Sequence, residues 1–288
     1  MKIIILGSTG YLGGNIVKRM VADGHDVFCV VRQTSDLSRI CHLPVKYIIS
    51  SVDQIEITLK TEKIDWIING VCTYNQNSRL YEDMFQSNLI FPLSVMNLAM
   101  RYGVENFVTF GTGLPDDFNV YSYTKSKLSE LGRFFSGRSE IKFYDLKLEM
   151  FYGGDFEPDS RFLRSTINKL YNNEQILLTS GAQKRDIIRV EDALDILSGI
   201  VSGNITFEDH YNLIPVGTGE NHSIREIVEF LKEQTGSSSE LVFGARPDRE
   251  GGEPDTLADM SWYTGRGLSL KYGYFEGLKS AAELYGKE

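Results

Sequence analysis

The sequence predicts an α/β fold in which a doubly wound parallel β-sheet is covered by helices on both faces. Short, almost continuously apolar runs alternate with helical patterns through the first half of the chain, and a glycine-rich turn follows the first run. Parallel strands buried on both faces have this apolar character, and the alternation indicates βαβ units. The pattern changes after Gly153. We therefore expect a sheet domain at residues 1–153 and a smaller α/β lobe at 154–288, with the chain crossing back to the sheet.

Each element has its own signal in the sequence. Short runs rich in β-branched and aromatic residues predict strands of the large sheet at residues 3–6, 27–31, 47–49, 66–68, 107–110 and 143–148. Helical patterns lie between them at residues 12–22, 81–101 and 121–135. In the lobe we expect helices at 161–171, 191–200 and 223–233, and strands at 176–178 and 211–214. Open α/β sheets bind ligands at the carboxyl ends of their strands, so we expect a site there.

The composition excludes several classes of protein. A net charge of −9 argues against a broad nucleic-acid-binding surface. No apolar run approaches the roughly 20 residues that cross a bilayer, and the chain begins with a strand pattern instead of a signal peptide. The three cysteines are scattered, and the four histidines lack metal-ligand spacing. We therefore expect a cytoplasmic protein with no metal site and no nucleic-acid or membrane partner.

The strongest motif is the glycine-rich turn at residues 7–13, between the first strand and the first helix. Gly7 permits a tight turn, Gly10 lets the backbone approach a pyrophosphate, and Gly13 lets the helix pack close to the strand. The helix N-terminus offers free N–H groups and a partial positive charge to the phosphates. This setting predicts a Rossmann dinucleotide site made of Gly7, Ser8, Thr9, Gly10, Tyr11, Leu12 and Gly13.

The residue after the second strand distinguishes NAD from NADP. NAD-binding proteins usually place Asp or Glu there to hold the ribose 2′-hydroxyl. This chain has Arg32, which can pair with a 2′-phosphate and stack on adenine. We therefore predict NADP(H) in preference to NAD(H). The alternative interpretation of Arg32 is an exposed loop arginine.

A Tyr and a Lys four residues apart lie on one helix face, and this spacing occurs twice, in Tyr121/Lys125 and Tyr123/Lys127. An ammonium group beside a phenol stabilises the phenolate, so the Tyr can exchange a proton with a substrate oxygen while hydride moves. The same Lys can hold the nicotinamide ribose. Helix geometry separates the two Tyr by about 200°, so only one can face the cofactor. We favour Tyr121 with Lys125 because Tyr121 stands at the helix start, closer to the sheet edge.

These features together resemble the extended short-chain dehydrogenase/reductase family, the sugar-nucleotide epimerases, dehydratases and reductases. The resemblance covers almost the whole chain and includes Asn88, residues 146–153 and residues 184–192, which are similar to the family's RDxxxVxD segment. Within the family, residues 111–115, 121–125, 146–149 and 178–186 look like CDP-paratose/CDP-abequose synthases. Those enzymes are NADPH-dependent reductases of a CDP-4-keto-3,6-dideoxyhexose. This comparison also favours the Tyr121 register.

The resemblance implies roles for further residues. Thr112 aligns with the family's catalytic Ser or Thr, whose hydroxyl polarises the substrate carbonyl. Its alternative role is that of a turn residue between two glycines. Arg185 and Arg249 are implied contacts to the nucleotide diphosphate, because guanidinium binds phosphate in bidentate geometry. Arg246 is the rival to Arg249.

Other interpretations remain open for three of these positions. Arg185 could instead form a surface salt bridge with Asp186 or Glu191. Asn88 is expected to be structural, joining backbone groups near the active-site helix. Met150 stands where many family members have an Asn that binds the substrate phosphate, so that contact is not expected here.

The spacing between Thr112 and Tyr121 indicates the reaction type. They are nine residues apart, whereas most extended members have a longer loop, and a short loop fits a simple reductase. We therefore expect NADPH-dependent reduction of a keto group on a nucleotide-linked deoxysugar. The alternatives are epimerisation on the same scaffold and a non-catalytic NADP(H) sensor. The resemblance also implies a homodimer, paired through the helices at 81–101 and 121–135.

Overall fold

A computed structural model describes residues 1–74 and 81–286, which divide into two units. The first unit contains Met1–Lys147 and Leu194–Ile214, and the second contains Leu148–Ala193 and Pro215–Glu288. The first boundary between the two units therefore lies at residues 147–148, a few residues before the boundary expected at residue 153. The reason is that β7 (Met150–Tyr152) is not part of the large sheet and pairs in parallel with β10 (Ile187–Arg189). Residues 194–214 return to the first unit.

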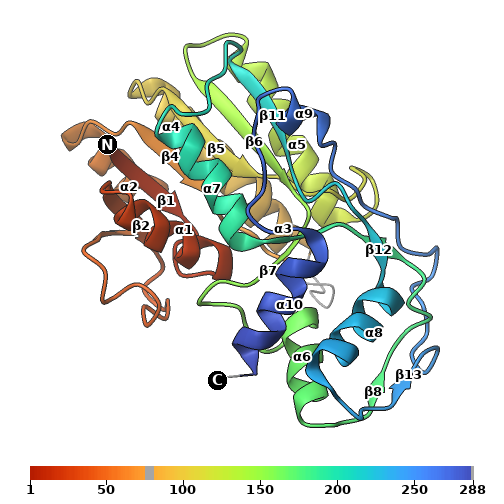
Figure 1. The fold of residues 1–288 in the computed structure, drawn as a ribbon. Coiled ribbons are helices and arrows are strands. Elements are labelled where there is room, and N and C mark those ends of the chain that lie inside the picture. Colours follow the sequence, from red (N-terminus) through yellow and green to blue (C-terminus); the bar gives the residue numbers. More distant parts are fainter. Residues whose placement is uncertain (75–80, 287–288) are drawn as a thin grey trace. The chain divides into compact units, whose positions relative to one another are not determined.

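The first unit is built on a seven-stranded sheet with the order β11-β6-β5-β4-β1-β2-β3 (Figure 1). Its strands are β1 (Lys2–Leu6), β2 (Asp26–Val31), β3 (Lys46–Ile49), β4 (Trp66–Asn69), β5 (Asn106–Phe110), β6 (Lys142–Leu148) and β11 (Tyr211–Val216). The pairs β1–β2, β1–β4, β2–β3, β4–β5 and β5–β6 are parallel. The strand order reverses between β1 and β4, which confirms the predicted doubly wound α/β class.

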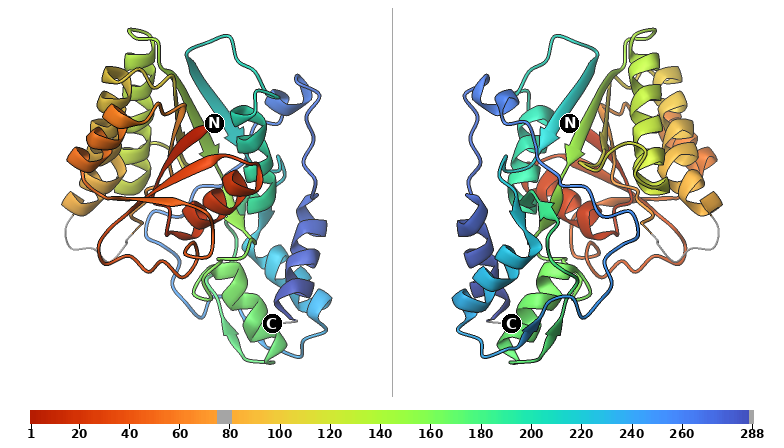
Figure 2. Two further views of the ribbon diagram at one scale, coloured as in Figure 1. Left: turned by 90° about the vertical axis from the view of Figure 1, so that its left-hand side faces the viewer. Right: turned by 90° about the vertical axis from the view of Figure 1, so that its right-hand side faces the viewer.

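Helices cover both faces of this sheet. They are α1 (Tyr11–Ala22), α2 (Val52–Thr61), α4 (Phe91–Arg101), α5 (Val120–Ser136) and α7 (Val190–Val201). Figure 2 shows α2, α4 and α5 on one face and α1 on the other. On the first face, the fully buried side chains of Ile4 and Leu6 join the core that Ile55 of α2 and Met96 of α4 complete. Strand residues that alternate between the two faces explain the continuous apolar character of the sequence.

One predicted helix is interrupted. Residues 81–101 form α3 (Tyr81–Phe85), a π-helical turn η1 (Gln86–Ile90) and then α4, instead of one regular helix. The π-turn contains Asn88, which is fully buried. A π-turn inserts an extra residue into the helix and often marks a functional position. Helix α2 was not expected from the sequence, because only Ile55 and Leu59 of this short helix are buried and its apolar pattern is weak.

The second unit packs three helices around its own core: α6 (Phe162–Tyr171), α8 (Ile224–Thr235) and α10 (Tyr274–Tyr285). Three pairs of short strands surround them, β10–β7, β12 (His222–Ser223) with β9 (Lys184–Arg185), and β13 (Leu241–Val242) with β8 (Ile176–Leu177). A four-residue helix, α9 (Ser261–Thr264), lies in the last segment. The start of α8 is fixed by a capping box between Ser223 and Glu226.

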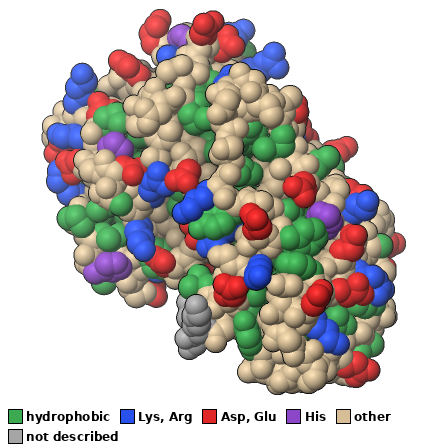
Figure 3. All heavy atoms as spheres, viewed as in Figure 1, with side chains coloured by type: hydrophobic (Ala, Val, Ile, Leu, Met, Phe, Trp, Pro, Cys, Tyr) green, Lys and Arg blue, Asp and Glu red, His purple; other side chains and the backbone are tan. Residues whose placement is uncertain are grey.

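The surface carries charges of both signs. On the face shown in Figure 3, acidic and basic side chains are interspersed. Within residues 1–74 and 81–286, no helix is both long enough and apolar enough to cross a membrane.

Candidate active site

The glycine-rich turn has the geometry of an anion-binding loop at the carboxyl end of β1. The Gly7 carbonyl accepts a hydrogen bond of 3.0 Å from the Gly10 N–H, and a Cβ at Gly13 would lie 2.0 Å from that carbonyl oxygen. Ser8 is fully buried, and its hydroxyl donates to the Val30 carbonyl at 2.9 Å, which ties the turn to β2. No side chain caps α1, which leaves its first N–H groups for an anion. The turn and the first residues of α1 together comprise Gly7, Ser8, Thr9, Gly10, Tyr11, Leu12 and Gly13.

Two arginines, not one, belong to the loop that follows β2. The side chain of Arg32 is exposed, and its backbone N–H donates to the Ser35 hydroxyl at 3.0 Å. Arg39 Nη1 donates to the Thr9 carbonyl at 3.0 Å, which ties this loop to the glycine-rich turn. Arg39 was not predicted as a site residue, since it lies in an irregular segment with no periodic signal. Its guanidinium is a second candidate for binding a phosphate.

Thr112 and Tyr121 meet at the carboxyl end of β5. The two side chains interact: burial raises the pKa of the Tyr121 phenol, and Thr112 opposes this rise. The Thr112 hydroxyl also accepts from the Leu114 N–H at 3.3 Å. Thr112 thus combines the turn role with a contact to Tyr121. The side chain of Asn119 caps α5 and sets the position of Tyr121 in its first turn.

The two Tyr/Lys pairs face in different directions. Lys125 is 5% exposed, and its Nζ donates to the Val71 carbonyl at 3.2 Å, just after β4. Tyr121 is half-buried, whereas Tyr123 is 43% exposed. The Lys127 ammonium lies 5.3 Å from the centre of the Tyr123 ring. The first pair is therefore directed toward the ends of the strands and the second toward the surface.

Two residues after β4 also contact Tyr121. The Tyr74 ring meets the Tyr121 ring edge to face, with 4.8 Å between the ring centres. Cys72 also interacts with Tyr121 and adds to the rise in the pKa of its phenol. Cys72 was not predicted as a site residue, because the spacing of the three cysteines was weighed only for disulfides and zinc sites. The available signal was the position of Cys72 immediately after a central strand, where ligand sites form.

Asn88 has the structural role that the sequence suggested. Its side chain accepts from the Thr73 N–H at 2.7 Å and donates to the Thr73 carbonyl at 3.0 Å and the Thr124 hydroxyl at 3.3 Å. Asn88 therefore joins the loop after β4 to α5, so the π-turn orients both segments that contribute to the site.

A polar cavity of about 160 Å³ lies beside these residues, between α5, β6 and β11, and Thr112 and Lys125 form part of its wall. Asp145 of β6 is 4% exposed and accepts a hydrogen bond from Ser129 on α5, whose hydroxyl is 2.8 Å from that of Tyr211. Burial raises the pKa of the Asp145 carboxyl, while Ser129 and the Lys125 ammonium oppose the rise. No sequence motif identified Asp145, because it is a single acidic residue within an apolar strand.

The predicted diphosphate ligands lie in the second unit. The Arg185 guanidinium donates to the Pro254 carbonyl at 2.6 Å and forms an ion pair with Glu253. Arg249 is exposed, and its backbone carbonyl accepts from the Gly252 N–H at 2.9 Å. Arg185 is thus held against residues 253–254 of the same irregular segment that contains Arg249.

The alternative salt-bridge partners proposed for Arg185 are wrong. Asp186 is fully buried and accepts hydrogen bonds from residues 218, 219 and 258. Glu191 pairs with Arg189, with 2.7 Å between Oε1 and Nη2. The ion pair of Arg185 comes instead from Glu253, a residue far away in the sequence.

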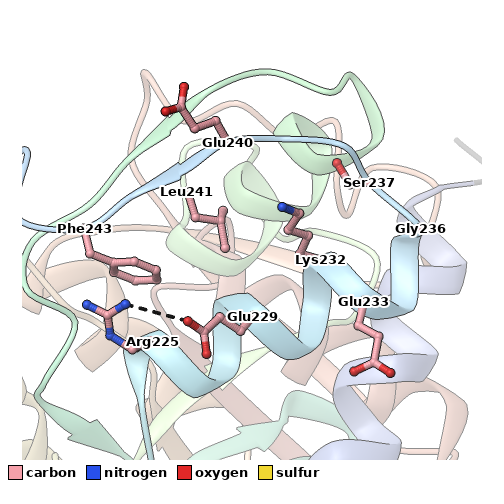
Figure 4. Close-up of a pocket in the computed structure, with 9 residues that line it drawn as sticks. All are labelled: Arg225, Glu229, Lys232, Glu233, Gly236, Ser237, Glu240, Leu241 and Phe243. Carbon is pink, nitrogen blue, oxygen red and sulfur yellow. Dashed lines mark ion pairs between the residues drawn. The ribbon is translucent and has the colours of Figure 1, made fainter.

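A larger hollow lies elsewhere in the second unit, between α8 and β13 (Figure 4). The Arg225 guanidinium lies over the Phe243 ring, 3.7 Å from its centre, and pairs with Glu229. The remaining lining residues include charges of both signs, and none of the predicted site residues is among them. We place the candidate active site at the strand ends of the first unit, because Thr112, Tyr121 and Lys125 gather there.

Comparison with known proteins gives matches over most of the chain. The profile of the NAD dependent epimerase/dehydratase family matches residues 3–213. CDP-abequose synthase from Salmonella muenchen is 24% identical over 285 residues, covering 96% of each chain.

Solved structures share the fold. UDP-glucose 4-epimerase from Thermotoga maritima, crystallised with UDP-glucose, superimposes with a TM-score of 0.83 at 19% identity, over 100% of this chain and 99% of the other. UDP-glucose 4-epimerase from Thermus thermophilus in complex with NAD gives a TM-score of 0.82 at 18% identity, over 99% of each chain.

Proposed function

Because the chain belongs to the NAD dependent epimerase/dehydratase family, we propose that it is a reductase that converts a ketone of a nucleotide-linked deoxysugar into an alcohol. The resemblance to CDP-abequose synthases predicted from the sequence is confirmed by matches at 23–25% identity over most of the chain. One observation carries the proposal. Tyr121, which interacts with Thr112 at the end of β5, stands one helical turn before Lys125, whose Nζ donates to the Val71 carbonyl after β4.

We propose NADP(H) as the cofactor, held by residues 7–13 and by the loop after β2. The close approach of Gly13 to the Gly7 carbonyl and the uncapped start of α1 fit a pyrophosphate. Arg32 and Arg39 would bind the 2′-phosphate, which an acidic residue at position 32 would repel. Bound NADPH would supply the hydride to the ketone carbon. NAD(H) is the alternative cofactor, since the Thermus thermophilus neighbour binds NAD.

The proton is assigned to Tyr121. Its phenol donates to the ketone oxygen as hydride reaches the carbon, so the C=O bond becomes a CH–OH group and Tyr121 is left as phenolate until solvent returns a proton. Thr112 donates a second hydrogen bond to the same oxygen and stabilises its developing negative charge. The Lys125 ammonium stabilises the phenolate and would hold the nicotinamide ribose.

We propose that Arg185 and Arg249 bind the diphosphate of a CDP-sugar. A diphosphate would replace Glu253 as the partner of the Arg185 guanidinium, because charge-assisted bidentate bonds to phosphate are stronger than most neutral hydrogen bonds. The homodimer expected from the sequence is also a proposal. It is supported by large apolar side chains exposed on the helix pair, namely Tyr81, Ile90, Tyr123 and Phe134.

The test follows NADPH absorbance, with NADH in parallel, against 4-keto-deoxysugars linked to CDP, dTDP, UDP or GDP. The proposal predicts stoichiometric oxidation of NADPH with one nucleotide class, CDP, preferred over the others. Epimerisation of a sugar nucleotide without net cofactor consumption would instead identify an epimerase. Binding of NADP(H) with no conversion of any substrate would indicate a sensor.

A further inference from the structure

The proposed proton donor stands where its own helix restrains it least. Tyr121 is the second residue of α5, which begins at Val120 after its cap Asn119. Inside a helix, the preceding turn excludes one of the three χ1 rotamers of a long side chain. No helical turn precedes Tyr121, so this restriction does not apply to it. Its ring therefore depends on contacts from other segments to hold the phenol in one direction.

The loop after β4 supplies such a contact. The ring of Tyr74 meets that of Tyr121 edge to face, with the ring centres 4.8 Å apart and an angle of 89° between the ring planes. Aromatic pairs favour this arrangement, because the positive edge of one ring lies against the negative face of the other. Tyr74 is 53% exposed. One part of its surface thus packs on Tyr121, while another part stays open to solvent.

The backbone that leads to Tyr74 is held at two residues. The Val71 carbonyl accepts a hydrogen bond of 3.2 Å from the Lys125 ammonium. The N–H and the carbonyl of Thr73 are both bonded to the side chain of Asn88, at 2.7 and 3.0 Å. Asn88 is fully buried, so the main chain immediately before Tyr74 has a fixed position from which its ring extends.

The same hydrogen bonds connect this loop to the backbone of Tyr121. Asn88 Nδ2 also donates to the Thr124 hydroxyl at 3.3 Å, and that hydroxyl donates to the Tyr121 carbonyl at 2.9 Å. The two rings therefore stand on segments that Asn88 and Thr124 join, and all these residues belong to the first unit. The contact between Tyr74 and Tyr121 is a consequence of this local framework.

We propose that Tyr74 is a positioning residue for Tyr121. Its ring limits the rotation of the Tyr121 side chain and keeps the phenol directed toward Thr112, where the ketone oxygen would bind. The effect on proton donation rests on the proposed function, whereas the restraint on the Tyr121 ring does not.

The restraint is tested in the protein without cofactor or substrate. Tyrosine is replaced throughout by 3-fluorotyrosine, and the ¹⁹F NMR signal of Tyr121 is assigned by its absence in Tyr121→Phe. In Tyr74→Ala this signal should broaden or split, because the Tyr121 ring samples several orientations. Tyr74→Phe keeps a ring that can pack edge to face and should retain the native line shape. A single signal of native width in folded Tyr74→Ala would overturn the proposal.

Kinetic measurements test the effect on proton donation. Tyr74→Ala should lower kcat by about 3- to 10-fold, as for loss of one aromatic pair. It should also raise the solvent deuterium isotope effect on kcat, because proton donation becomes slower. Tyr74→Phe should restore both values. Tyr47→Ala removes a tyrosine of similar exposure from the edge strand β3 and is the matched control, with native kinetics expected.

The kinetic outcomes separate positioning from other roles of Tyr74. A higher KM with unchanged kcat and isotope effect would overturn the proposal, because that pattern indicates a contact to the substrate alone. An equal fall of kcat in Tyr47→Ala would also overturn it, since the loss would then be unspecific. If the native protein oxidises no NADPH, the reductase proposal fails, and the ¹⁹F signal still decides whether Tyr74 restrains Tyr121.

Discussion

Two buried aspartates, one in each unit, have opposite surroundings. Asp186 in the second unit is fully buried, and each of its carboxylate oxygens accepts two hydrogen bonds. The donors are the Thr218 N–H and hydroxyl, the Gly219 N–H and the Ala258 N–H, at 2.7–3.0 Å. Asp145 in the first unit has a hydroxyl partner for Oδ2, but its Oδ1 lacks a hydrogen-bond partner among the described residues.

The difference separates a structural carboxylate from a candidate functional one. Asp186 belongs to the segment that resembles a family motif, yet its hydrogen bonds all go to the loops around residues 218 and 258. Asp145 belongs to no recognised motif and lies beside Thr112 and Lys125 in one cavity. A fully satisfied buried group stabilises the fold, whereas a partly satisfied one requires another explanation.

The largest effect is expected at the proton donor. Tyr121→Phe removes the hydroxyl and should lower kcat by roughly 10²–10⁴-fold while NADPH binding stays nearly unchanged. Steady-state kinetics and cofactor titration measure the two quantities. Tyr123→Phe is the matched control and should retain activity, because its ring is exposed. Loss of activity in the control alone would move the assignment to Tyr123 and Lys127.

The second largest effect is expected on stability. Asp186→Asn replaces one acceptor oxygen by a donor that faces N–H groups, and should cost about 3 kcal/mol of unfolding free energy. Urea denaturation measures the loss. Asp159→Asn, at an exposed aspartate of the same unit, should change the unfolding free energy by less than about 0.5 kcal/mol. Equal losses of unfolding free energy in both variants would contradict the structural role assigned to the Asp186 carboxylate.

A smaller effect is expected on the choice of cofactor. Arg32→Ala and Arg39→Ala should each raise the KM for NADPH by about 10- to 100-fold, equivalent to about 1.4–2.7 kcal/mol. The KM for NADH should change little, because NADH lacks the 2′-phosphate. Arg101→Ala, which removes an exposed arginine of the same unit, is the control. Similar increases in the KM values for NADPH and NADH would mean that these arginines do not bind the 2′-phosphate.

The smallest effect concerns pH. Burial raises the pKa of Asp145 in the folded protein above its unfolded value. The folded protein therefore binds the Asp145 carboxyl proton more tightly than the unfolded chain does. This proton binding stabilises the folded state at low pH, and the stabilisation is lost as the pH rises through the pKa of Asp145 in the folded protein. Asp145→Asn should raise the melting temperature at pH 8 by a few degrees, for about 1 kcal/mol, and give no gain at pH 4. A gain of the same size at both pH values would show that ionisation is not the cause.

The sequence was sufficient for features that depend on local periodicity. Six strands of the large sheet, the turn at residues 7–13 and the Tyr/Lys spacing follow from short-range patterns, and the structure has the predicted strand–helix alternation. The seventh strand, β11, was expected in the smaller lobe, because its place in the large sheet depends on pairing with the distant β6. The π-turn around Asn88 was not predictable, because residues 81–101 have an ordinary helical pattern. The two-residue strands of the second unit carry too few residues to show any period.

The remaining site residues depend on contacts between distant segments. Asp145 accepts a hydrogen bond from Ser129, which lies 16 positions earlier in the sequence. The Ser129 hydroxyl in turn contacts that of Tyr211, which lies 82 positions after Ser129. Arg39 meets the glycine-rich turn only through its bond to the Thr9 carbonyl. Such contacts arise from the packing of the sheet and helices and leave no signal in the neighbouring sequence.

Transfer of deuterium tests the proposed reduction most directly. The protein would be incubated with a CDP-4-keto-deoxysugar and NADPH deuterated at C4 of the nicotinamide, and the product examined by mass spectrometry and proton NMR. The reductase account predicts one deuterium at the carbon that carries the new hydroxyl for each NADPH oxidised. A converted sugar nucleotide without deuterium, formed with no net loss of NADPH, would contradict it.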